Sequence, residues 1–363
     1  MMAMDFAPSL RLLLLAGTLA LLPLGWLWWR RPQADARRRM AGLMALTLFL
    51  TFDLIVFGAF TRLSDSGLGC PDWPGCYGHA SPIGAASDIH AAQSAMPTGP
   101  VTFSKAWIEM IHRYLAMTVG ALIVVMTALG WSRRQTLPFS PWWPTATLVW
   151  VIVQGLFGAL TVTLKLKPAI VTLHLLGGML LLAMLAAQHQ WLRARPLRWP
   201  GWARAVLIGT TALLVLQIAL GAWVSSNYAV LACSGFPQCN GAWWPDMDFR
   251  EGFTLYRALG RDGDGDFLPV EALVAIHMAH RLFAVLATLA LLGLAHLLWH
   301  RLAQRRAALL LLGLLLLQVA SGLSNVVLGW PLLAALVHTA GAAAMVGLLS
   351  MLLARAAHPR QRS

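Results

Sequence analysis

Charged residues are scarce in this chain. They make up 11% of its 363 residues, whereas 58% are hydrophobic. Acidic residues are scarcest, with 14 aspartates and glutamates against 27 lysines and arginines and a formal net charge of +13. The basic residues stand in short clusters between apolar blocks, which argues against the continuous basic surface that binds nucleic acid. A membrane protein fits this composition, and a nucleic-acid-binding protein does not.

A cleavable signal sequence is also missing. The first apolar run, residues 10–29, is too long for the apolar core of a cleaved signal. Trp28, Trp29, Arg30 and Arg31 close it, with no small-residue cleavage site. We therefore expect residues 1–36 to form a retained N-terminal transmembrane anchor.

Long apolar blocks account for most of the chain. Each is long enough to cross about 30 Å of hydrocarbon as a helix. Punctuation by proline, glycine and charge predicts nine spans, at residues 10–29, 40–61, 105–131, 142–164, 169–193, 202–225, 270–298, 307–328 and 332–354. The predicted fold is an all-α polytopic membrane protein.

Arginine clusters predict the sidedness of the spans. If every span crosses once, the clusters share one face, which the positive-inside rule makes cytoplasmic at the cell inner (plasma) membrane. They are Arg30, Arg31, Arg37, Arg38 and Arg39; Arg133 and Arg134; Arg193, Arg195, Arg198 and Arg204; Arg301, Arg305 and Arg306; and Arg355, Arg360 and Arg362. The N-terminus and the loops 62–104 and 226–269 then face outward, and the C-terminus is cytoplasmic.

The chain contains a duplication. Cys233 and Cys239 follow Cys70 and Cys76 by 163 residues. Likewise Gln318 and His338 follow Gln154 and His174 by 164 residues, and His280 follows His112 by 168. The repeat predicts two pseudo-symmetric four-helix bundles, 37–198 and 199–363. Because each contains four spans, both enter the membrane from the same side.

Four histidines lie at duplicated positions within the apolar spans: His112, His174, His280 and His338. In each half the two imidazoles are expected at one depth on two helices, which suits ligation of a haem iron from both faces. The alternative is a hydrogen bond from each histidine to a neighbouring helix.

Charged neighbours accompany these histidines. Arg113 and Arg281 follow the first histidine of each pair and could bind haem propionates or extend to the outer headgroups. Glu109 lies three residues before His112, where the second half has His277, and this asymmetry indicates one catalytic site and one cofactor site. The structural alternative pairs Glu109 with Arg113 or Lys105.

The four cysteines form two local pairs in the loops predicted to face outward. Cys70 with Cys76 and Cys233 with Cys239 suggest two short-loop disulfides, either structural or redox-active, rather than zinc ligands. Another recurring pattern is Gln-x-x-x-Gly, at Gln154, Gln217 and Gln318, which we interpret as helix packing.

The motifs GAFTRLSDSGLGCPDWPGC, EMIHR and TLHLLGG, repeated as GAWVSSNYAVLACSGFPQC, HMAHR and VHTAGA, resemble those of the haem A synthase family over residues 40–354. The resemblance implies oxidation of the C8 methyl of haem O to a formyl group, with water as the oxygen source, for haem-copper oxidases. It places the substrate haem on His112 and His174 with Glu109 catalytic, and a haem b cofactor on His280 and His338. Arrival of haem O from haem O synthase is expected, and the electron acceptor is unidentified.

Two other functions are compatible with the pattern. A di-haem b-type electron carrier would have no substrate haem, and a transporter built on a parallel repeat would use the histidines as proton relays. The placement of all four histidines in the outer half, and of a glutamate in one half only, favours the enzyme.

Overall fold

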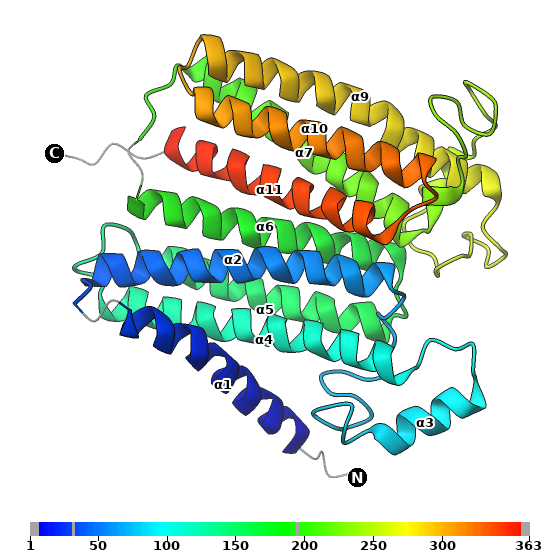
Figure 1. Ribbon diagram of the computed structural model, residues 1–363, viewed down its shortest axis with the longest axis horizontal. Helices are drawn as coiled ribbons and strands as arrows, with labels where there is room; N and C mark the ends of the chain where they lie inside the picture. The colour runs from blue at the N-terminus through cyan, green and yellow to red at the C-terminus, as the bar shows by residue number, and fades with distance from the viewer. Residues whose placement is uncertain (1–6, 31–32, 194–195, 357–363) are drawn as a thin grey trace. The chain divides into compact units, whose positions relative to one another are not determined.

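The computed structural model describes residues 7–30, 33–193 and 196–356 (Figure 1). These residues form helices and no β-strand. The long helices are α1 (Ala7–Trp29), α2 (Ala36–Leu63), α4 (Phe103–Ser132), α5 (Trp142–Thr163), α6 (Pro168–Arg193), α7 (Gly201–Ser226), α9 (Val270–His300), α10 (Arg305–Val327) and α11 (Leu332–Ala356). Shorter helices in the connections are α3 (Ala86–Ala95), η1 (Ala229–Leu231) and α8 (Phe249–Gly252).

The long helices match the predicted spans. Within the described ranges, nine helices are long and apolar enough to cross a membrane. The largest boundary difference is at the start of α2, predicted at residue 40 and observed at Ala36. The prediction of an all-α polytopic membrane protein is therefore confirmed.

Side-chain hydrogen bonds satisfy polar groups at the helix ends and within the spans. Asp35 caps α2 by accepting from the backbone N–H of Arg38 at 2.7 Å, and Thr102 caps α4 by accepting from that of Lys105 at 3.2 Å. Inside α2, the hydroxyl of Thr47 donates to the carbonyl of Leu43 at 2.9 Å. Hydrocarbon supplies no hydrogen-bond partners, so such internal bonds let an apolar helix contain threonine.

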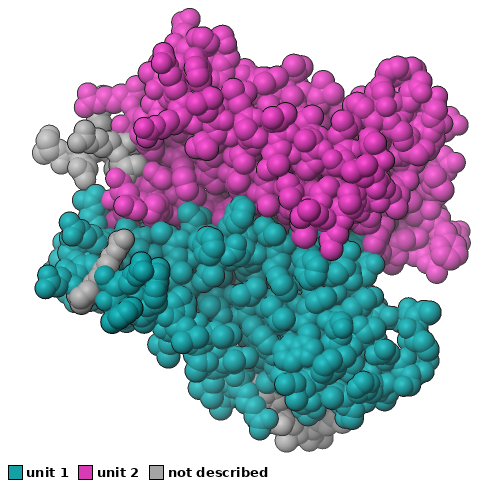
Figure 2. All heavy atoms as spheres, in the orientation of Figure 1, with its two compact units in different colours: residues 1–165 teal, residues 166–363 magenta. Residues whose placement is uncertain are grey.

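Two compact units divide the chain, residues 1–165 and 166–363 (Figure 2). In unit 1, α4 packs against α1, α2 and α5. Near the start of α4, Leu12 of α1 joins Cys70, Cys76, Ala106 and Met110 in a buried apolar cluster. The N-terminal helix is thus packed against the cysteine-containing loop of its own unit.

Unit 2 contains α6 to α11. Here α10 packs against both α9 and α11, and α7 packs against α9 and α11 (Figure 1). Helix α6 packs against α7 and α11. Cys233 and Cys239 are buried with Val274 and Met278 of α9. The second cysteine-containing loop therefore lies on the first turns of α9.

The unit boundary falls before α6, whereas the predicted domains are 1–36, 37–198 and 199–363. Those domains, with their two four-helix bundles, rest on the sequence repeat and stay a prediction. The sidedness also stays a prediction, and four of its arginines, Arg31, Arg195, Arg360 and Arg362, lie outside the described residues.

Candidate functional site

The four repeated histidines lie on four different membrane helices. His112 is on α4 in unit 1, and His174, His280 and His338 are on α6, α9 and α11 in unit 2. The predicted pair His280 and His338 therefore falls within one unit. Its rings are close enough to interact electrostatically. His112 and His174 belong to different units and are described separately.

A glycine of α2 faces the ring of His112. A Cβ atom added at Gly58 would lie 2.9 Å from Nε2 of His112, closer than real Cβ contacts come. The ring of Phe57 is parallel to this imidazole, with an interplanar angle of 10° and 6.4 Å between centroids. Gly58 therefore provides the space that the imidazole occupies.

The same arrangement recurs at His280. A Cβ atom added at Gly221 of α7 would lie 3.0 Å from Cε1 of His280. One turn earlier, Nε2 of Gln217 lies 3.1 Å from Nδ1 of this ring and 3.3 Å from the His280 carbonyl oxygen. Gly221 thus makes room for the ring, and Gln217 holds it.

His338 has a matching set of neighbours on α10. A Cβ atom added at Gly322 would lie 3.1 Å from its Cε1. The amide of Gln318 donates to the His338 carbonyl at 2.8 Å, and Oγ of Ser321 lies 3.0 Å from Nδ1. In unit 2 the Gln-x-x-x-Gly pattern therefore seats a histidine, a role that our packing interpretation missed. Its recurrence at the offset of the histidines was the available signal.

The hydrogen bonds of Ser321 define the protonation of His338. Its hydroxyl donates to the Leu317 carbonyl at 2.6 Å, so its oxygen accepts from the imidazole and Nδ1 bears the proton. Nε2 then has a free lone pair, the form that binds a metal.

Gln217 can make the corresponding bond to His280. Its Oε1 is buried and has no hydrogen-bond partner within the described residues. Turning the amide over places Oε1 against Nδ1–H and leaves Nε2 of the ring for a metal. The paired imidazoles and their glycine seats fit a haem iron held between His280 and His338.

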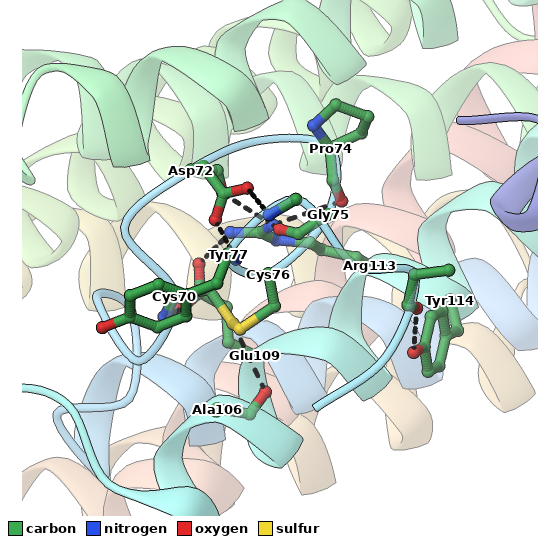
Figure 3. The surroundings of a disulfide bond; sticks show 12 residues. Cys70, Asp72, Pro74, Gly75, Cys76, Tyr77, Ala106, Glu109, Arg113 and Tyr114 are labelled. Carbon is green, nitrogen blue, oxygen red and sulfur yellow. Dashed lines mark hydrogen bonds and ion pairs between the residues drawn. A yellow bond between two sulfur atoms is a disulfide. The ribbon is translucent and has the colours of Figure 1, made fainter. Parts of the chain in front are cut away.

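A buried ion pair anchors the first cysteine-containing loop (Figure 3). Glu109 and Arg113, one turn apart on α4, are 4% and 7% exposed and form a salt bridge. Oε2 of Glu109 also accepts from the backbone N–H of Cys70 at 2.8 Å. The Arg113 guanidinium donates to the carbonyls of Asp72, at 2.9 Å, Pro74 and Gly75. The structural alternative for Glu109, pairing with Arg113, is thus the geometry observed.

The second half repeats the arginine but not the carboxylate. Arg281 donates to the carbonyls of Gly235, at 3.1 Å, and Gln238, at 3.2 Å. These residues follow Asp72 and Gly75 by 163 positions. His277 replaces Glu109, is 3% exposed, and hydrogen-bonds through Nδ1 to the Ala229 carbonyl at 3.0 Å. Both arginines thus hold loop carbonyls, and their contact with haem propionates stays a prediction.

Both expected disulfides are present, Cys70–Cys76 and Cys233–Cys239. Each is followed by a pair of backbone hydrogen bonds, between Cys76 and His79 and between Cys239 and Ala242. In the first loop, burial and the nearby carboxylates of Asp72 and Asp88 raise the pKa of Tyr77. The two loops share one local structure, which supports the duplication inferred from the sequence.

Comparison with known proteins places the chain in a family. The profile of the cytochrome oxidase assembly protein family (COX15-CtaA) matches residues 41–350. The chain belongs to this family. The match includes all four repeated histidines, Glu109 and both disulfides.

Individual relatives agree with this membership. A haem A synthase of Shewanella oneidensis is 39% identical over 315 residues, which are 85% of this chain and 94% of that protein. Proteins of the same name from Shouchella clausii and Rhizorhabdus wittichii are 29% and 24% identical. They cover 58% and 88% of this chain, and 66% and 95% of their own lengths.

Proposed function

We propose that this chain is a haem A synthase, a membrane oxidoreductase that converts the C8 methyl of haem O to the formyl group of haem A. The observation that supports this most is the 39% identity with the Shewanella oneidensis haem A synthase across 94% of that protein. The glycine-seated histidines His112, His280 and His338 supply the ligand type that such an enzyme needs.

Each half of the repeat has its own haem in this proposal. His112 and His174 hold the substrate haem O, and His280 and His338 hold a haem b cofactor. Two features support the second pair: both histidines lie in one unit, and each has a polar group at Nδ1. When bound, haem b supplies one-electron transfer.

The reaction removes four protons and four electrons from the methyl group and one water, by two hydroxylations followed by loss of water from the gem-diol. Glu109 is proposed as the residue that accepts protons. It lies one turn from His112 on α4, which puts its carboxylate beside the substrate haem. Arg113 and the Cys70 N–H hold that carboxylate in place, so it is oriented before substrate binds.

Arg113 and Arg281 are proposed to bind haem propionates as well as loop carbonyls. In the described part of the chain, Nε of Arg281 is buried and has no hydrogen-bond partner. A carboxylate is the partner that a guanidinium accommodates best.

Partners and orientation are also part of the proposal. Haem O synthase is the donor of haem O within the bilayer, and the electron acceptor is unassigned. The N-terminus and both cysteine-containing loops face outward and the C-terminus faces the cytoplasm of the inner membrane, as the arginine clusters predict.

Expression with a source of haem O, followed by chromatography of extracted haems, tests this function. Haem A or its hydroxylated intermediate supports the enzyme. Haem b alone at both sites would replace it with the di-haem electron carrier. A protein that contains no haem would support the transporter.

A further inference from the structure

Polar groups meet the two histidines of the second half at Nδ1. Ser321 lies 3.0 Å from Nδ1 of His338, and Gln217 lies 3.1 Å from Nδ1 of His280. Both partners come from the helix whose glycine seats the same ring. Each histidine is therefore held in both position and rotation by one neighbouring helix.

The first half has different residues at the matching positions. Leu54 precedes Gln217 by 163 residues, and Phe157 precedes Ser321 by 164, the offsets of the repeat. Neither side chain contains a hydrogen-bonding group. The glycines are kept, however, because Gly58 and Gly158 match Gly221 and Gly322. The duplication thus preserved the ring seats and changed the residues beside them.

A hydrogen bond at Nδ1 affects how an imidazole binds iron. It selects the tautomer whose Nε2 is available, fixes the ring plane and makes the ligand more basic. A more basic ligand favours ferric over ferrous iron and slows loss of the metal.

We propose that Ser321 and Gln217 are positioning residues that hold His338 and His280 as Nδ1–H tautomers and so make the second half retain its haem. This inference rests on the proposed function. A cofactor haem must stay through many turnovers, whereas a substrate haem must enter and leave. Leucine and phenylalanine at the matching positions suit the site that exchanges its haem.

Replacing Ser321 with alanine tests the proposal, with Ser324→Ala as the matched control. Ser324 is on the same helix and its hydroxyl bonds only the Ala320 carbonyl in the described structure, at 2.8 Å. We expect Ser321→Ala to lose haem b to apomyoglobin about tenfold faster than the control. Its midpoint potential should rise by about 40 mV, which is a fivefold change at about 59 mV per tenfold. Ser321→Thr should restore both values.

Exchange of residues between the halves gives a second, independent test. Gln217→Leu should release haem b faster, and Leu54→Gln should slow release of haem from the first half. These two variants decide the matter if Ser321→Ala does not fold. The proposal is overturned if Ser321→Ala behaves as Ser324→Ala does, or if both exchanges leave release rates unchanged.

A His338→Ala variant separates this inference from the proposed function. If it keeps the wild-type haem content, haem ligation by His338 is wrong and the proposed function loses its cofactor site. If it loses haem while Ser321→Ala matches its control, only the role of Ser321 is refuted.

Discussion

Substituting Gly221 with alanine should separate helix stability from haem binding. Alanine is the better helix former by up to about 1 kcal/mol, so α7 itself gains stability. The new Cβ would lie 3.0 Å from Cε1 of His280, and ordinary contacts begin at 3.4 Å, so the ring must move by a few tenths of an ångström. Overpacking of this kind costs about 1–3 kcal/mol, which lowers haem affinity about 5- to 150-fold.

Gly209→Ala is the matched control on the same helix, because a Cβ there meets nothing within 4 Å. Both variants should gain helix stability, measured by thermal unfolding of the haem-depleted protein. Only Gly221→Ala should lose haem b, measured as pyridine haemochrome absorbance per polypeptide. Equal haem content in the two variants would refute the idea that Gly221 seats a haem ligand.

Three further predictions concern the cysteine-containing loops and their anchors. Glu109→Gln should still bind haem but lose conversion of haem O, and unchanged conversion in extracted haems would remove its catalytic role. Arg113→Leu should destabilise the protein by about 3–5 kcal/mol because it strands the buried carboxylate of Glu109. Arg281→Leu should cost less, since carbonyls are its hydrogen-bond partners in the described residues; equal losses in thermal unfolding would contradict this. Replacing both Cys70 and Cys76 with serine should cost about 2 kcal/mol for so short a loop, and limited proteolysis of loop 62–104 should then be faster.

The spans and the repeat could be predicted from the sequence because each depends on local composition or on residue offsets. Apolar length alone defines a membrane helix, so nine of them were predicted with boundaries close to those observed. Cys70 and Cys76 are near in sequence, and their pairing needed no knowledge of distant segments. The constant offset of the duplicated residues likewise requires no coordinates.

The contacts between helices could not be predicted in the same way. Arg113 was expected to reach a haem propionate, yet its guanidinium contacts carbonyls of a loop about forty residues earlier. The Gln-x-x-x-Gly patterns were recognised, but not that in unit 2 they face His280 and His338. Spacing shows which residues share a helix face and leaves open which neighbour that face meets.

The sequence by itself therefore determined an all-α membrane protein, a duplication, and four histidines suited to bind haem. Only the tertiary structure decided how these histidines are held: a glycine opposite each described ring, Ser321 and Gln217 at Nδ1, and Glu109 bound to Arg113 and Cys70. The physical reason is that apolar length and periodicity are properties of one segment. A hydrogen bond between helices depends on how two segments rotate against each other.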